Sequence, residues 1–207
     1  MWCMIKRIII LFALLLFPYS ALAYEGYEQY YFHGKEFGIW LPSSFSVVHE
    51  NMEDGETCVG ISAQEAEGFL SDNGIDLYAS YDDGNKYFLI YTLPGFFDSE
   101  APFSDWSTLV GMEKYWVNTL DESNTLVFSE VYHSNDFDEC SGFVNLAYTF
   151  VVGDETAHCL EYVTALEEDI IGIIFTSREG QFNIEEEHLA KEIVDKLFDV
   201  WVTVNTL

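Results

Sequence analysis

Residues 143–152 read Phe-Val-Asn-Leu-Ala-Tyr-Thr-Phe-Val-Val, which is the clearest alternation in the chain. The even-numbered positions are apolar throughout. Three of the odd-numbered positions between them are polar or small: Asn145, Ala147 and Thr149. Because side chains of a strand point alternately to its two faces, this pattern predicts a strand in a sheet with one dry side. Another part of the chain must cover that side.

Three further apolar runs flank this strand, separated by acidic or Gly-containing connections that are typical of turns. The predicted strands are residues 126–133, 157–166 and 170–176. Consecutive strands joined in this way form an antiparallel meander.

The first half of the chain predicts shorter strands joined as hairpins. These strands are residues 29–33, 37–41, 57–63, 77–81 and 86–92. The strongest local turn signal is Asp83-Gly84, because Gly adopts a positive φ without steric cost.

Two amphipathic helices are expected among these strands. The first begins at a cap on Ser104 or Asp105 and continues to residue 120. The second has Asn183 as its N-cap and Glu186 at the capping-box position, and it extends to Trp201. The chain is therefore predicted to be α+β, an antiparallel β-sheet of meander and hairpins with two helices packed on one face. We expect the last helix to cover the dry side.

The order of these elements resembles a known family. An opening hairpin leads into Phe37-Gly38-Ile39-Trp40-Leu41-Pro42-Ser43-Ser44-Phe45. A closing strand, Ile171-Gly172-Ile173-Ile174-Phe175-Thr176, precedes the helix that ends at Trp201. In these features residues 30–201 resemble the α+β family of PsbP and DcrB. The resemblance implies an accessory or binding protein rather than an enzyme, and it carries over no functional residue.

The N-terminal 23 residues predict an export signal. Lys6 and Arg7 precede the ten apolar residues 8–17, and Ala21-Leu22-Ala23 offers small side chains to a signal peptidase. A helix needs roughly 20 apolar residues to cross a bilayer, so this run is too short to be an anchor. We expect cleavage after Ala23, a single domain over residues 24–207 with no integral membrane span, and a periplasmic or secreted location.

The charge is strongly one-sided, with 36 acidic residues, 8 basic residues and a formal net charge of -28. This balance excludes a nucleic-acid partner, because phosphate contacts require clustered Lys and Arg. A solvated surface is the simplest explanation of the acidity. The functional alternatives are docking onto a basic partner and binding of a hard cation.

Four residues between two strands of the meander have side chains that ligate metals: His133, Asp136, Asp138 and Glu139. They are the candidate site for a divalent cation, the one cofactor that the sequence suggests. Their spacing matches no recognised metal-binding loop, and acidic loops are common in so acidic a chain.

Three cysteines follow the export signal, and an oxidising compartment would permit a disulfide. The meander places Cys140 about eight residues along its strand from the position opposite Cys159. This separation of ~26 Å is far beyond disulfide range, so these two are not expected to pair. Cys58 paired with Cys159, Cys58 paired with Cys140, and three reduced thiols all remain open.

Four aromatic residues are candidates for an exposed partner-binding patch: Tyr27, Tyr30, Phe96 and Phe97. The sequence contains no nucleophile elbow, zinc-protease helix or phosphate-binding loop. The principal expectation is an exported, non-catalytic accessory or binding protein of the cell envelope that interacts with another protein. The alternatives are a divalent-cation-binding protein and an enzyme of unrecognised type.

Overall fold

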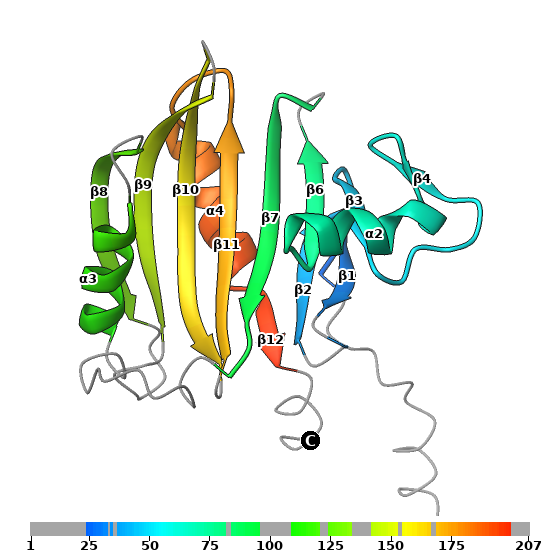
Figure 1. The fold of residues 1–207 in the computed structure, drawn as a ribbon, viewed down its shortest axis with the longest axis horizontal. Helices are drawn as coiled ribbons and strands as arrows, with labels where there is room; N and C mark the ends of the chain where they lie inside the picture. The colour runs from blue at the N-terminus through cyan, green and yellow to red at the C-terminus, as the bar shows by residue number, and fades with distance from the viewer. Residues whose placement is uncertain are drawn as a thin grey trace, which may run out of the picture.

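The computed structural model describes residues 24–32, 34, 37–81, 84–95, 109–120, 124–133, 142–152, 155–166 and 169–199. These residues form a seven-stranded sheet, a three-stranded sheet, a two-stranded hairpin and three helices (Figure 1). The α+β class predicted from the sequence is confirmed.

The large sheet is antiparallel throughout and joins the two strand-rich parts of the chain. In spatial order its strands are β3 (Ser46–His49), β6 (Leu77–Tyr81), β7 (Lys86–Leu93), β11 (Asp169–Ser177), β10 (Glu155–Leu166), β9 (Gly142–Val152) and β8 (Asn124–His133). The predicted meander corresponds to β8–β11. The join lies between β7 and β11, where the rings of Phe88 and Phe175 stack with their centroids 5.3 Å apart.

The small sheet consists of β1 (Tyr27–Phe32), β2 (Phe37–Pro42) and β12 (Leu197–Asp199). The final helix was expected to reach Trp201, but helix α4 (Ile184–Val194) ends earlier and is followed by strand β12. Leu197 keeps the helical spacing of apolar residues, but its backbone pairs with Ile39 of β2 instead. The segment that local periodicity predicts as helix therefore forms a strand at the edge of β2.

The strand predicted over residues 57–63 is instead a short hairpin followed by a helix. The hairpin consists of β4 (Thr57–Cys58) and β5 (Ile61–Ser62), and the helix is α2 (Ala63–Asn73). Val59 and Gly60 make the turn with positive φ values of 53° and 78°. A capping box begins α2, and Gly74 ends it in the left-handed conformation.

The two predicted helices lie on opposite faces of the large sheet, which corrects the expectation of a single covered face (Figure 1). Helix α3 (Leu109–Thr119) packs on the face that carries Val144, Leu146 and Tyr148, called here the α3 face. Helix α4 and the small sheet pack on the other side, the α4 face, which carries Ala147, Leu160 and Tyr162.

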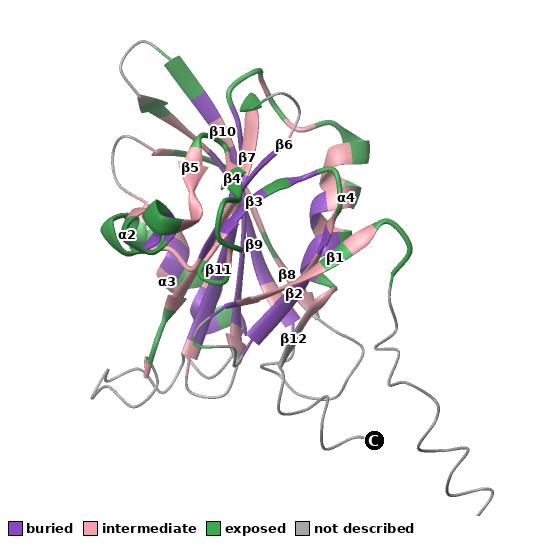
Figure 2. Ribbon diagram, turned by 90° about the vertical axis from the view of Figure 1, so that its right-hand side faces the viewer, coloured by how far each residue is buried: buried purple, intermediate pink, exposed green. Residues whose placement is uncertain are grey.

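Both faces of the central strands are apolar, so each requires a cover. Ile170 of β11 packs in the α3 cluster, whereas its neighbour Ile171 packs in the α4 cluster. Figure 2 shows the buried positions along the central strands and on the inner side of α4. Within the described part of the chain, no helix is long and apolar enough to cross a membrane.

Candidate functional site

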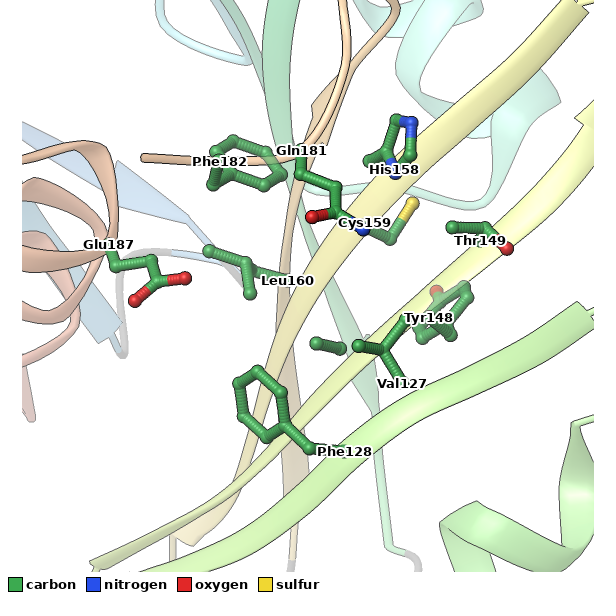
Figure 3. Close-up of a pocket in the computed structure, with 11 residues that line it drawn as sticks. Val127, Phe128, Tyr148, Thr149, His158, Cys159, Leu160, Gln181, Phe182 and Glu187 are labelled. Atoms are coloured by element: carbon green, nitrogen blue, oxygen red, sulfur yellow. The ribbon is translucent and has the colours of Figure 1, made fainter. Parts of the chain in front are cut away.

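A pocket of about 70 Å³ opens between the large sheet and the N-terminal end of α4 (Figure 3). Phe128, Ala147 and Leu160 line it from strands β8, β9 and β10. Phe182 and Glu187 line it from the opposite side, and the Glu187 carboxylate points from α4 toward Leu160. One enclosed water needs only about 10–15 Å³ of such volume, so the pocket is several times that size. The pocket therefore has room for the end of a single side chain.

Carboxylates from β8 and α4 act on Tyr162, which lies two residues after the pocket residue Leu160 on β10. The hydroxyl of the buried Tyr162 has a raised pKa, first because it is buried and then because three carboxylates act on it. These belong to Glu130 of β8, Glu187 of α4 and Asp195 at the end of α4. Negative groups from two distant segments therefore converge above β10. We call this surface, from Phe128 and Phe182 to Glu130 and Glu187, the α4 groove.

Polar side chains of the groove contact one another and a neighbouring ring. Asn145 is 5% exposed, and its Nδ2 donates to Oε1 of Glu130 at 3.0 Å. Its Oδ1 is buried and has no hydrogen-bond partner among the described residues. The ammonium of Lys191 lies 3.9 Å from the centre of the Tyr132 ring, where it makes a cation–π contact. A positively charged donor group would complement this surface.

The first turn of α4 is fixed by its cap. Oδ1 of Asn183 accepts hydrogen bonds from the backbone N–H groups of Glu185 and Glu186, at 2.9 and 3.0 Å. The Glu186 carboxylate accepts from the Asn183 N–H at 2.7 Å, which completes the predicted capping box. Glu186 also forms an ion pair with Lys86 of β7. These contacts hold the turn that carries Glu187 against the sheet.

The α3 face contains a second cluster of polar groups, which sequence reasoning missed. Glu161 of β10 is 6% exposed, and its carboxylate accepts hydrogen bonds from the hydroxyl of Tyr91, at 2.7 Å, and from that of Tyr148. Nε1 of Trp116 in α3 donates to the Tyr91 hydroxyl at 3.2 Å. Burial raises the pKa of Glu161 even though these donors act in the opposite direction. The available signal was a single acid in the apolar run 159–163.

The Glu161 cluster is enclosed, so it is not a candidate ligand site. Cys159 lies beside it, with Sγ 3.5 Å from Oγ1 of Thr176. Burial raises the pKa of the Cys159 thiol to about 11. A thiol in this environment remains protonated near neutral pH and is a poor nucleophile.

Cys58 and Cys159 are both free, so the disulfide considered between them is not formed in the structure. Cys58 packs against a small cluster formed by Val48 with Ala66 and Leu70 of α2. Cys159 packs on the α3 face with Leu146. The third cysteine, Cys140, lies outside the described residues.

The predicted metal ligands fall mostly outside the described part of the chain. The backbone of His133 ends β8, and Asp136, Asp138 and Glu139 lie beyond it among residues that are not described. Within the described residues, no group of three or more His, Cys, Asp or Glu side chains could hold a metal ion. The cation site at His133 therefore stays a prediction.

The two predicted partner-binding tyrosines that the structure describes are half-buried on β1. The Tyr27 hydroxyl donates to Glu192 of α4 at 2.8 Å, and burial is the main reason that its pKa rises to about 12. The Tyr30 hydroxyl donates to Glu28 at 2.9 Å. Because they are three residues apart on a strand, the two rings point to opposite sides. Phe96 and Phe97, the other two candidates, lie outside the described residues.

Comparison with solved structures supports the resemblance in element order. The solution structure of cyanobacterial PsbP (CyanoP) from Synechocystis sp. PCC 6803 matches with a TM-score of 0.52 and 13% identity, over 89% of this chain and 98% of that chain. The fold is PsbP-like. A crystal structure from Bacteroides thetaiotaomicron covers 84% of this chain and 48% of its own, with 15% identity and a TM-score of 0.45. No protein-family profile and no curated sequence matches the chain. At these identities the PsbP-like likeness describes the fold alone.

Proposed function

We propose that this chain is an exported, non-catalytic accessory protein of the cell envelope that binds another protein through the α4 groove. The observation that carries the proposal is the composition of the groove. An apolar pocket lies beside convergent carboxylates from β8 and α4, on a surface that solvent reaches at Val127 and Glu130. Concave apolar surfaces with a few placed polar groups are typical of binding sites.

Three further observations support a binding role. The sequence of residues 1–23 predicts an export signal, which favours an envelope location. The PsbP-like fold accords with the accessory role that the family resemblance implies. The Glu161 carboxyl is 6% exposed and accepts a hydrogen bond from Tyr91 inside the α3 face, so it does not reach the pocket.

The proposal is tested by crosslinking in cells that express the full chain. A photoreactive amino acid replaces Val127, which is 55% exposed at the mouth of the pocket. The matched control carries it at Val110, which is 49% exposed on α3. We expect a discrete protein adduct from position 127 that position 110 does not give. The same adducts from both positions, or none from position 127, would contradict the proposal.

Export is tested separately by the intact mass of the protein recovered from the envelope fraction. We expect a chain that begins at Tyr24. A chain that retains residues 1–23 and fractionates with the cytoplasm would contradict the export part of the proposal while leaving the groove to be tested by crosslinking.

A further inference from the structure

The strand that borders the α4 groove is also an edge of the large sheet. β8 is ten residues long and, among the residues that the structure describes, pairs only with β9 (Figure 1). The backbone N–H and C=O groups on its outer side therefore face no described strand. Such an edge is a template to which another extended chain can add.

The other edge of the same sheet is much less available. β3 is four residues long and lies against β1 and β4. β8, in contrast, contains neither Lys nor Pro, the residues that commonly block strand addition. Its protective features are the charged Glu130 and a bulge at Val127, where the pairing register with β9 shifts between Leu126 and Phe128. The stretch from Phe128 to Tyr132 beyond the bulge pairs regularly.

A strand added to β8 would place its side chains directly beside the groove. Phe128 packs on the α4 face, and Glu130, two residues later, is hydrogen-bonded to Asn145 on that face. Neighbouring strands lie about 4.8 Å apart, so alternate side chains of an added strand fall beside Phe128 and Glu130. These side chains meet apolar surface first and carboxylates next.

The charges of the groove indicate which kind of side chain an added strand would place there. Three carboxylates act on Tyr162, and the nearby Lys191 is engaged with the Tyr132 ring. A long side chain with an apolar stem and a cationic end would match both the pocket and the acceptors. A second copy of this chain is a poor occupant, because two molecules of charge -28 repel each other.

We propose that the α4 groove binds an extended cationic segment of the partner, which adds to β8 as an eighth strand and directs a Lys or Arg side chain toward Glu130 and Glu187. This inference rests on the proposed function and specifies the chemistry of the partner. Backbone hydrogen bonds to β8 fix the position of the partner segment along the strand. The carboxylates favour a segment that carries positive charge.

The test uses labelled peptides of about six residues, the usual strand length, with Arg alternating with Thr and Val. Binding to residues 24–207 is measured by fluorescence anisotropy. One control peptide has Gln in place of Arg. A second keeps Arg but carries N-methyl groups on alternate backbone nitrogens, which prevents strand pairing without changing the charge. We expect the Arg peptide to bind and both controls to lose at least about tenfold in affinity.

Variants of the protein separate the groove from the general acidity of the chain. The double variant Glu130→Gln and Glu187→Gln should weaken Arg-peptide binding at least about tenfold. Glu67→Gln removes one exposed carboxylate on α2, far from β8, and should change affinity by no more than a few-fold. None of these side chains is in the buried core, so we expect all variants to fold. Thermal unfolding of each variant checks this expectation.

Each other outcome overturns a stated part of the inference. Equal binding of the Gln peptide removes the cation preference, and equal binding of the N-methylated peptide removes strand addition. Equal weakening by Glu67→Gln and by the groove variants reduces the effect to surface charge. Dimers of the free protein that Val127→Arg dissociates would assign the edge to a second copy. Failure of all the peptides, with crosslinking from position 127 intact, would reject the inference and leave the proposed function standing.

Discussion

The two faces of the large sheet differ in how far Glu161, on one face, and Glu130 and Glu187, on the other, are buried. On the α3 face, Glu161 is buried and meets hydroxyl groups from β7 and β9 as well as the indole of Trp116, through Tyr91. On the α4 face, Glu130 is exposed and Glu187 half-exposed beside a pocket. A buried acid whose lone pairs meet donors is part of the interior, whereas partly solvated acids beside apolar surface remain available to a ligand. We therefore expect Glu161 to contribute to the stability of the fold, whereas Glu130 and Glu187 belong to the proposed binding groove.

The largest expected effect is the loss of the indole that closes the α3 face. Trp116→Ala should lower the free energy of unfolding by about 3–5 kcal/mol, because it leaves a cavity and removes the donor to Tyr91. Phe182→Ala at the half-exposed rim of the α4 groove should cost about 1 kcal/mol. Urea unfolding of both variants measures the contrast. Similar losses from the two would mean that the groove is also structural.

The next effect concerns the glycine that makes room for Tyr91. A Cβ added at Gly172 of β11 would overlap the Tyr91 ring, which is bound to Glu161 and cannot turn aside without losing that bond. Gly172→Ala should therefore cost about 1–3 kcal/mol. Gly68→Ala is the matched control, because this helical position in α2 has no neighbouring atoms and the change should stabilise the helix by up to about 1 kcal/mol. Calorimetric melting of the two variants should show shifts of opposite sign.

The buried acid should also make stability depend on pH. Burial raises the pKa of Glu161 above its ordinary value of 4.5. Below pH 4.5 the group is mostly protonated in both states, so its contribution is fully present. As the pH rises, the unfolded chain ionises first, and this contribution falls by at most about 1.4 kcal/mol per pH unit until the folded pKa is passed.

Comparison with Glu161→Gln isolates this effect from those of other carboxyl groups. The variant keeps a neutral side chain of the same shape at every pH, so its unfolding free energy should fall less between pH 4.5 and 7 than that of the parent chain. Identical pH profiles would show that Glu161 ionises as readily in the folded protein as in the unfolded one.

The smallest effect distinguishes stabilising a helix from shaping the groove. Asn183→Ala removes the cap of α4 and should cost about 1 kcal/mol. Ser62→Ala at the N-cap of α2 should cost a similar amount, because it removes the hydroxyl that donates to the Glu65 carboxylate at 2.6 Å. Only Asn183→Ala should also weaken the Arg peptide, since the first turn of α4 holds Glu187. Equal peptide affinities for the two variants would show that the Asn183 cap does not contribute to peptide binding in the groove.

Local sequence signals predicted the parts of the fold that depend on neighbouring residues. The alternation in residues 143–152 and the short connections around it predicted the meander, and Asn183 with Glu186 predicted the start of α4. Helix α2 was missed although its signals were present, because Ile61 and Val59 favoured a strand. Ser62, Glu65 and Gly74 mark both ends of that helix.

The candidate site was less accessible to sequence reasoning, because its members come from different elements. Glu130 and Glu187 are two of 36 acidic residues, and no local pattern distinguishes them. The short spacing of His133 to Glu139 instead drew the prediction to a single loop. Tyr91 and Glu161, which form a hydrogen bond, are 70 residues apart in the chain.

The sequence by itself determined the α+β class, the meander and the capped start of the last helix, since these follow from side-chain alternation and from hydrogen bonds within a few residues. Only the tertiary structure decided which helix covers which face. Strands β10 and β11 are apolar on both sides, so their pattern is compatible with α3 or α4 on either. Packing of segments far apart in the chain selects one arrangement, which encloses Glu161 and leaves Glu187 at the surface.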